Sequence, residues 1–279
     1  MAKDDIAGKS VLITGAGSGF GKLVAQKLAA RGALITGADI QKEAVAHVME
    51  EIREAGGQAV HVHADVVSAE DMTKVAKAAV ENFGAIDVLI NNAGIMPLAY
   101  FKDHERAATA WSKSIDINIK GVVHGISAVY DQMIAQGRGH VVNVSSIYGN
   151  AGIAGSGVYS ATKSAVNTIS DSLRNESKGK IKVTTIKPTG VMSTNLAGSV
   201  VNPEAFFGIL GGNVAEFSRR IELSERNELD ASYSDQDSIS FGSLQPGAIA
   251  DSIIWAIDQP WGVSISDVTI RASGDLFTY

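Results

Sequence analysis

The stretch "SVLITGAGSGFGKLVAQKLAARG", residues 10–32, decides the fold of this chain. It opens with a short apolar, β-branched run typical of a buried strand and closes with the apolar spacing of an amphipathic helix. Between the two, "TGAGSGFG" at 14–21 places Gly15, Gly19 and Gly21 at the mouth of the helix. Glycines permit a tight turn there, so that a pyrophosphate can bind the free N–H groups and the positive dipole end of the helix.

A glycine cluster alone is weak evidence for nucleotide binding, and its simpler interpretation is a flexible turn. Here the strand before it and the helix after it supply the context that a dinucleotide site requires. The same turn places Ser18 and Phe20 among the expected cofactor contacts.

The alternation of strand and helix continues along the chain. Residues 68–84, for example, have the pattern of a helix with a Ser68 cap and a Gly84 end. Strands are predicted at residues 10–14, 33–38, 59–64, 86–91, 139–146, 181–188 and 263–270. Their nearly continuous apolar runs indicate parallel strands covered on both faces. We therefore expect an α/β fold: a single Rossmann-type, doubly wound domain over residues 1–279 with a mostly parallel, seven-stranded sheet.

The alternation of strands and helices stops after the sixth predicted strand. We interpret residues 190–245 as a long substrate-covering insertion with some helix, not as a second domain. Its scattered Phe and Leu residues suggest a pocket for an apolar alcohol, cyclic or terpenoid, although they would also serve to pack a lid onto the body. Arg219, Arg220 and Arg226 would suit a substrate phosphate or carboxylate if they faced the site.

Asp39 ends the second predicted strand, 24 positions after Gly15. A carboxylate there can accept both ribose hydroxyls and would repel a 2′-phosphate, which predicts NAD and not NADP as the cofactor. Neither Ser18 nor Ile40 offers the cation that a 2′-phosphate would require. The plainer interpretation of Asp39 is a turn residue at a strand end. Asp65, after the third strand, either meets the adenine edge or caps the next turn.

Several motifs together resemble the classical short-chain dehydrogenase/reductase family. They are "TGAGSGFG", "NNAG" at 91–94, Asn118, "VNVSS" at 142–146 and "YSATK" at 159–163, and they follow the family's order and spacing between about residue 8 and 190. The resemblance implies that one Rossmann-type domain carries the whole site, with an Asn–Ser–Tyr–Lys active centre.

The resemblance also implies a role for each residue of that centre. Tyr159 would be the general acid/base, and Lys163 would lower its pKa and hold the nicotinamide ribose. Asn118 matches the asparagine that holds a water in a proton relay. For the serine there are two candidates, Ser145 and Ser146, and the family's usual spacing of 13 residues before the tyrosine selects Ser146.

The cofactor contacts follow from the glycine turn, the strand ends and the family pattern. They are Gly15, Ser18, Gly19, Phe20, Gly21, Asp39, Ile40, Asp65, Val66, Asn92, Ala93, Gly94, Tyr159, Lys163, Pro188, Thr189, Gly190, Val191 and Thr194. The chain departs from the family at "KPTGVMSTN", where a Pro-Gly pair is usual. Either Thr189 replaces the glycine or one residue is inserted before Thr194.

The chemistry explains why these residue types are needed. Oxidising a secondary alcohol removes a hydride from carbon, which a nicotinamide accepts, and a proton from oxygen. A free phenol has a pKa of about 10 and is a poor base at neutral pH. A cation one helical turn away, as Lys163 is from Tyr159, favours the phenolate. Ser146 can then donate to the substrate oxygen as its charge develops.

Composition and charge exclude other classes of function. The net charge is −6, and no dense run of Lys and Arg suggests nucleic acid as a partner. The chain has no Cys, and its six His are scattered, so we expect no metal site. The N-terminal stretch lacks the apolar core of a signal peptide and no run could span a bilayer, so we expect a cytoplasmic protein without a membrane partner. The resemblance further implies a homotetramer or homodimer.

The predicted function is an NAD-dependent oxidoreductase that interconverts a secondary alcohol and its ketone. Two alternatives remain open. A catalytically idle dinucleotide-binding sensor or scaffold would need the glycine turn but not the base. An epimerase would pass through a transient ketone on the same scaffold.

Overall fold

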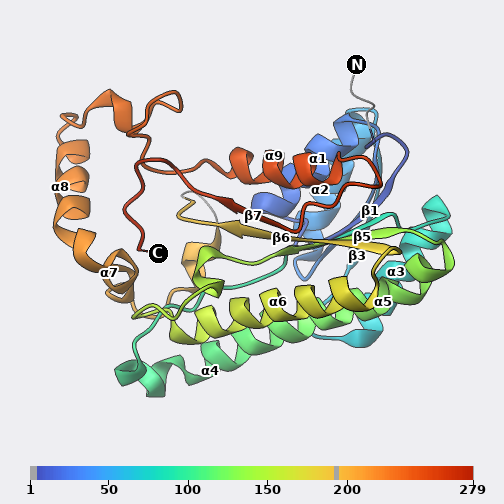
Figure 1. Ribbon diagram of the computed structural model, residues 1–279, viewed down its shortest axis with the longest axis horizontal. Helices are drawn as coiled ribbons and strands as arrows, with labels where there is room; N and C mark the ends of the chain where they lie inside the picture. The colour runs from blue at the N-terminus through green and yellow to red at the C-terminus, as the bar shows by residue number, and fades with distance from the viewer. Residues whose placement is uncertain (1–4, 192–194, 279) are drawn as a thin grey trace.

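The computed structural model describes residues 5–191 and 195–278. Its centre is one seven-stranded sheet in the order β3-β2-β1-β4-β5-β6-β7 (Figure 1). The strands are β1 (Ser10–Thr14), β2 (Leu34–Asp39), β3 (Gln58–His63), β4 (Val88–Asn91), β5 (Gly139–Val144), β6 (Ile181–Pro188) and β7 (Asp267–Ile270). Each predicted strand is present, although β7 begins at Asp267 and not at residue 263. The predicted Rossmann-type α/β fold is confirmed, and every pairing between these strands is parallel.

Helices cover both faces of the sheet (Figure 1). One face carries α1 (Gly19–Ala30), α2 (Lys42–Glu54) and α9 (Pro246–Ile257), and the other carries α3 (Ala69–Phe83), α5 (Gly121–Ala135) and α6 (Gly157–Glu176), with α4 (His104–Ile115) packed against α6. Each face encloses its own apolar core, which explains why the strands lack a polar side. None of the described helices is long and apolar enough to cross a membrane.

The topology creates a crevice at the carboxyl ends of β1 and β4. β1 pairs with β2 on one side and with β4 on the other, so that the order of strands along the chain reverses there. Ligands of open α/β sheets bind at such a reversal. The glycine turn follows β1, and the "NNAG" stretch begins at the last residue of β4. Both therefore lie at this crevice.

The sequence of residues 110–133 has one continuous helical pattern, but the structure interrupts it. A π-helical turn, Asp116–Lys120, joins α4 to α5 and contains the buried Asn118. Such turns are frequent at functional sites. The interruption turns the amide of Asn118 toward the interior, where it meets the chain that follows β4.

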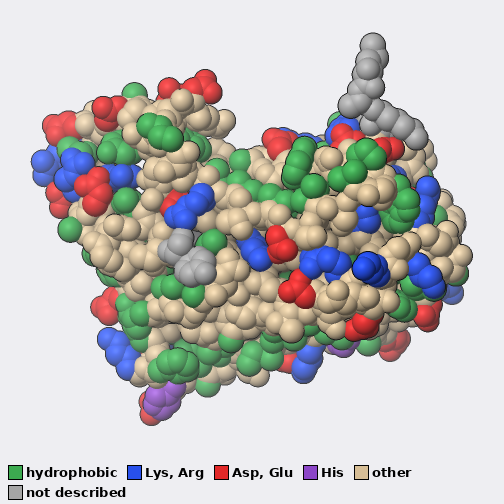
Figure 2. Space-filling view, viewed as in Figure 1, with side chains coloured by type: hydrophobic (Ala, Val, Ile, Leu, Met, Phe, Trp, Pro, Cys, Tyr) green, Lys and Arg blue, Asp and Glu red, His purple; other side chains and the backbone are tan. Residues whose placement is uncertain are grey.

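The insertion forms a lobe beyond the carboxyl ends of the strands, built around α7 (Ala205–Leu210) and α8 (Val214–Glu225) (Figure 1). Figure 2 shows a notch between this lobe and the body of the molecule. The C-terminal segment after β7 runs into the lobe: Thr278 donates to the Ile209 carbonyl through N–H at 3.1 Å and Oγ1 at 2.9 Å. Asn213 Nδ2 also donates to the Leu276 carbonyl at 2.8 Å. The insertion and the C-terminus are therefore one folded unit.

Candidate active site

The glycine turn has a geometry that only glycine fits. Gly15 and Gly19 have φ of +67° and +53°, in the left-handed region that favours glycine. A Cβ on Gly21 would lie 2.1 Å from the carbonyl oxygen of Gly15 and 2.7 Å from Nδ2 of Asn92. Ser18 begins α1 without a side-chain hydrogen bond to it. The turn therefore brings bare backbone to the start of α1, which suits a cofactor's pyrophosphate.

Thr14 and Asn92 join the two strand ends at the crevice. Oγ1 of Thr14 accepts from the N–H groups of Asn92 at 3.1 Å and Ala93 at 3.2 Å. Nδ2 of Asn92 donates to the carbonyls of Thr14 at 3.0 Å and Gly15 at 3.1 Å. The predicted contact Asn92 thus supports the turn through its own side chain. Thr14 was not among the predicted site residues, although a hydroxyl at the end of the first strand was a visible signal.

Asp39 lies directly beside the glycine turn. Its Oδ2 accepts from the N–H of Gly17 at 2.9 Å and its Oδ1 from the N–H of Gln41 at 2.9 Å. The residue is buried, and the neighbouring Ile40 is 57% exposed. Two backbone donors therefore fix the negative charge at the end of β2, and the side chain cannot swing away from the turn without losing both.

The end of β3 lies next to this carboxylate. Oδ1 of Asp65 accepts from the N–H of Val67 at 2.9 Å, which is the turn-capping role that the sequence allowed for it. Val66 packs against Gly121, where a Cβ would lie 2.8 Å from its Cγ2. The structure leaves both residues at the edge of the crevice, half-buried.

Tyr159 and Lys163 lie on α6, and both are buried. The Lys163 Nζ lies 5.9 Å from the centroid of the Tyr159 ring and donates to the Val144 carbonyl at 2.8 Å. Burial of a Tyr and a Lys one turn apart excludes the ordinary solvent-facing pair. Their heads meet at the carboxyl end of β5.

Burial controls the pKa of each group. Loss of solvation lowers the pKa of Lys163 to about 8. It raises the pKa of Tyr159 to about 12, and a hydrogen bond with Ser146 opposes that rise. The lowered phenol pKa expected from the resemblance is therefore not a property of the chain by itself, because desolvation of the phenolate outweighs the favourable contact.

The two candidate serines have different partners. Ser145 Oγ donates to the Lys163 carbonyl at 3.1 Å, a bond that holds β5 to α6. Ser146 Oγ accepts from the N–H of Tyr148 at 3.2 Å, and Ser146 lies near enough to Tyr159 to oppose the rise in its pKa. The geometry thus favours Ser146 over Ser145 as the serine of the site.

Asn118 connects the π-helical turn to the segment after β4. Its Oδ1 accepts from the Ile95 N–H at 3.0 Å, and its Nδ2 donates to the Ile95 carbonyl at 2.9 Å and to Thr162 Oγ1 at 3.0 Å. Gly94 passes so close that an added Cβ would lie 3.2 Å from the Asn118 Oδ1 and 3.5 Å from the Lys163 Nζ. The four expected catalytic residues and the "NNAG" stretch therefore converge.

The segment after β6 is held by the C-terminus. Thr189 donates through its N–H to the Ile270 carbonyl at 3.0 Å and through Oγ1 to Oδ2 of Asp275 at 3.0 Å. The ring of Phe277 packs directly on Gly190, where an added Cβ would lie 1.6 Å from Cε2 of that ring. Val191 bridges to Leu244. The predicted contact Thr194 lies outside the described residues, so the two possible alignments of this segment both remain.

An apolar cluster surrounds the head of Tyr159; we call it the Tyr159 cluster. Its buried members are Leu98, Ile147, Tyr148, Tyr159, Ala205 and Ile209, and Met96, Tyr100, Ile153, Val200, Phe206 and Phe277 pack against them. The rings of Phe206 and Phe277 meet edge to face with centroids 5.8 Å apart. The insertion and the C-terminus thus supply an apolar wall beside Tyr159. The aromatic residues near the end of the sequence were a visible signal for the part that the C-terminus contributes.

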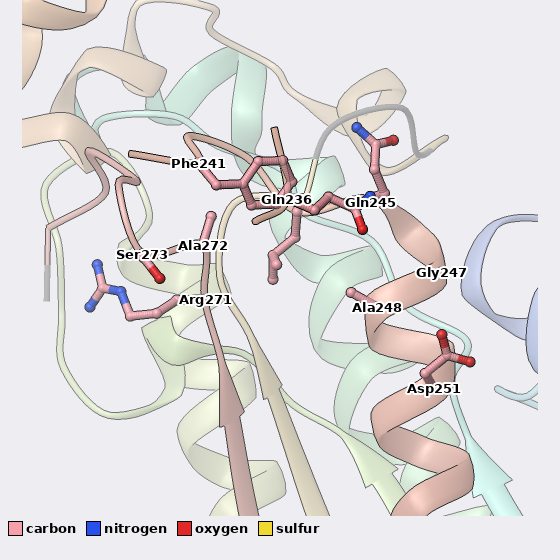
Figure 3. Close-up of a pocket in the computed structure, with 10 residues that line it drawn as sticks. Gln236, Phe241, Gln245, Gly247, Ala248, Asp251, Arg271, Ala272 and Ser273 are labelled. Atoms are coloured by element: carbon pink, nitrogen blue, oxygen red, sulfur yellow. The ribbon is translucent and has the colours of Figure 1, made fainter. Parts of the chain in front are cut away.

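A cavity of about 450 Å³ opens on the other side of the segment that follows β6. Figure 3 shows it between the start of α9, the end of β7 and the insertion residues Gln236 and Phe241. Phe20 of the glycine turn, Val191 and Phe241 pack on the same core. One lining residue, Leu244, pairs with the predicted contact Val191, while none of the four catalytic candidates and none of the predicted cofactor contacts lines the cavity itself.

The arginines of the insertion are engaged with the lobe itself. Arg219 and Arg220 both bind Glu216, at 2.8 and 2.9 Å, and the two guanidinium groups lower the pKa of that carboxyl to about 2. The Arg220 guanidinium also lies 4.2 Å from the centroid of the Tyr233 ring. These contacts give Arg219 and Arg220 structural roles. Among the described residues, no group of three or more His, Asp or Glu could hold a metal ion.

Comparison with known proteins places the chain in a family. The family model for short chain dehydrogenase matches residues 9–205. The uncharacterized oxidoreductase Lmo0432 of Listeria monocytogenes is 34% identical over 95% of this chain and 96% of its own, and the uncharacterized oxidoreductase MW2403 of Staphylococcus aureus is 31% identical over 94% and 96%.

Solved structures show the same fold. A short chain dehydrogenase/reductase from Burkholderia phymatum in complex with NAD is 27% identical, with a TM-score of 0.74 over 95% of this chain and 89% of its own. An alcohol dehydrogenase from Thermococcus sibiricus, complexed with 5-hydroxy-NADP, has a TM-score of 0.77 at 22% identity over 97% and 99%. From its motifs, its fold and its relatives, this chain belongs to the short-chain dehydrogenase family of oxidoreductases.

Proposed function

We propose that the chain is an NAD-dependent oxidoreductase that interconverts an apolar secondary alcohol and its ketone. The observation that carries the proposal is the burial of Tyr159 and Lys163 one helical turn apart, with the Lys163 Nζ 5.9 Å from the centroid of the phenol ring and an apolar wall around them. A sensor or scaffold would gain nothing from burying a phenol and an ammonium together, because burial of ionisable groups costs stability.

Each residue of the proposed site has a separate role in the reaction. When bound, the nicotinamide would supply the hydride acceptor and a positive charge beside the phenol. Tyr159 takes the proton from the substrate hydroxyl in oxidation and returns it in reduction. Ser146 donates to the substrate oxygen, and Lys163 holds the ribose and keeps a cation near the phenol. Asn118 fixes the backbone at Ile95 and so the floor of the site.

The raised pKa of Tyr159 fits this division. In the chain alone the phenol stays protonated at neutral pH, because its pKa is about 12. The positive charge of an oxidised nicotinamide favours the phenolate, so that the base forms only in the complex that needs it. With a reduced cofactor the charge is absent, and Tyr159 remains protonated as the acid for ketone reduction.

The choice of NAD rests on Asp39. Relatives in this fold are found in complex with NAD and with NADP, so the fold alone does not select between them. A carboxylate fixed by the N–H groups of Gly17 and Gln41 leaves its remaining lone pairs for ribose hydroxyls and repels a 2′-phosphate.

Replacing Asp39 by Ala should weaken NAD binding by about 10- to 100-fold, because charge-assisted hydrogen bonds to the ribose are lost. The same change should narrow or reverse the difference in affinity between NAD and NADP, because the carboxylate that repels the 2′-phosphate of NADP is removed. Titration of the variant with each oxidised cofactor, followed by thermal shift, measures both effects. Asp87→Ala is the matched control, because it removes a carboxylate that also accepts from a backbone N–H, that of Ser10 at 3.0 Å, but at the amino ends of the strands. Stronger stabilisation of the natural chain by NADP than by NAD would refute the assignment.

A screen for turnover tests the proposed function directly. The purified chain, supplied with NAD and a panel of apolar secondary alcohols that includes cyclic and terpenoid ones, should produce NADH, measured by its absorbance. Cofactor-dependent turnover should disappear when the cofactor is omitted. Stereochemical inversion without net NADH release would indicate an epimerase instead, and thermal stabilisation by NAD with no turnover of any alcohol or ketone would favour the sensor.

We also propose that the chain assembles as a homotetramer or homodimer. A shallow apolar groove lies between α4 and α6, lined by Phe101, Ile115, Ile119 and Val158 among others. Phe101 is 71% exposed and Ile115 is 44% exposed. Ile115→Glu would place a charge in the groove and should shift the chain toward monomer in sedimentation velocity, with the exposed Ile239→Glu as control. A natural chain that sediments as a monomer would contradict the proposal.

A further inference from the structure

Tyr148 is held next to the catalytic residues but has no role among those described above. Its backbone N–H donates to Oγ of Ser146 at 3.2 Å, which places it two residues after the catalytic serine and on the same short turn. Its side chain is 95% buried, at 5% relative exposure, within the Tyr159 cluster.

The hydroxyl of Tyr148 has no hydrogen-bond partner among the described residues. A buried tyrosine hydroxyl normally finds one, because burying it unpaired is costly. Other unpaired buried atoms of the described chain, such as Oγ of Ser10 and Oγ1 of Thr36, belong to strands β1 and β2 and lie outside the Tyr159 cluster. The Tyr148 hydroxyl is therefore the unpaired group within the apolar wall of the site.

Burial raises the pKa of this phenol, the charges of Asp275 and Tyr159 add to the rise, and Arg271 opposes it. Asp275 already accepts from Thr189 and Arg271. The Tyr148 hydroxyl thus lies in the same buried cluster as Tyr159, and its donor is unused by the described residues.

We propose that Tyr148 is a specificity-determining residue whose hydroxyl donates a hydrogen bond to a second, neutral oxygen of the substrate. The inference rests on the proposed function, since Ser146 and Tyr159 hold the reacting oxygen. The substrate class is then an apolar alcohol or ketone that carries another hydroxyl or carbonyl close to the reacting carbon, such as a vicinal diol or hydroxyketone. A polar site of this kind discriminates against analogues that lack the second oxygen, because its donor is then left unpaired.

The test compares cyclohexanol with its vicinal diol in the natural chain and in Tyr148→Phe, which removes one oxygen and keeps the ring. The ratio of kcat/KM for the diol to that for the mono-alcohol should exceed one in the natural chain and fall about 10-fold in Tyr148→Phe, mostly through KM for the diol. The matched control is Tyr100→Phe, whose hydroxyl donates to the Glu204 carbonyl at 3.2 Å in the same cluster. It should leave the ratio unchanged.

Two further measurements separate this role from a structural one. Tyr148→Phe should melt no lower than the natural chain, because no protein hydrogen bond is lost, and its affinity for NAD should be unchanged. With NADH present, the diol should raise the melting temperature of the natural chain more than that of Tyr148→Phe.

A ratio unaffected by Tyr148→Phe, or a lower melting temperature for this variant, would overturn the inference. Turnover of the mono-alcohol alone would overturn it while leaving the proposed function intact. If the natural chain neither oxidises the diol nor is stabilised by it, the inference fails whatever the outcome of the wider alcohol screen.

Discussion

Tyr159→Phe should lower kcat for alcohol oxidation by about 10³-fold, the range expected when a general acid/base is removed. The ring remains, so the apolar cluster around it keeps its packing. What is lost is the oxygen that bonds to Ser146 and exchanges a proton with the substrate. Steady-state kinetics on any alcohol that the natural chain oxidises gives the measurement.

The pH dependence of the reaction also tests Tyr159 as the general acid/base. Oxidation needs the phenolate, so the rate for the natural chain should rise with pH up to the apparent pKa of Tyr159 in the complex. That value should lie below the pKa of about 12 that burial gives the phenol in the chain alone. The residual rate of Tyr159→Phe should lose the part of this dependence that belongs to the phenol, because the phenol oxygen is absent, while Lys163, with a pKa of about 8, still titrates.

Tyr130→Phe is the matched control for the catalytic change, since Tyr130 lies on α5, packs against the core beneath α3, α5 and α6, and is outside the Tyr159 cluster. It should retain the natural rate. Tyr130→Phe should bind NADH as the natural chain does, and Tyr159→Phe should lose far less in NADH affinity than in kcat, both measured by fluorescence. A Tyr159→Phe protein with an unchanged rate would show that another group moves the proton.

The sequence predicts the fold well because local and long-range signals agree. The apolar runs are long, the glycines follow the first strand, and each strand is followed by a helix, so the parallel order is nearly determined. The four candidate catalytic residues are predicted for a different reason: their spacing matches a known family. They lie just after β5, on the π-helical turn and on α6, which the structure brings together.

Other parts of the site leave no periodic signal. The turn after β5 brings the Tyr148 side chain into the same buried cluster as Tyr159, and nothing in the sequence distinguishes this tyrosine from the other five. Asp275 and Phe277 reach the segment after β6 only when the C-terminus folds back, a contact between residues 86 apart for Thr189 and Asp275. The π-helical turn is hidden because Asn118 lies within an otherwise regular helical pattern. Such features depend on tertiary packing, which overrides local preference.

Gly21→Ala should have the second largest effect, on both cofactor binding and stability. The added methyl would lie 2.1 Å from the Gly15 carbonyl oxygen and 2.7 Å from Nδ2 of Asn92, so the turn and the end of β4 must move apart. Forcing a methyl into close-packed backbone costs about 1–3 kcal/mol of stability. Displacement of the turn should weaken NADH binding by about 100-fold, because the N–H groups at the start of α1 no longer converge on the pyrophosphate.

Gly262→Ala is the control, because a Cβ at Gly262 meets nothing within 4 Å and its φ is not in the left-handed region. NADH fluorescence titration and thermal melting of the two variants give the comparison. A loss of stability without a loss of affinity would mean that the turn adjusts and that the pyrophosphate is held elsewhere. If the loss in free energy of NADH binding exceeds the loss in free energy of unfolding, the pyrophosphate binds at the start of α1. The methyl then disturbs the backbone donors there more than it disturbs the core.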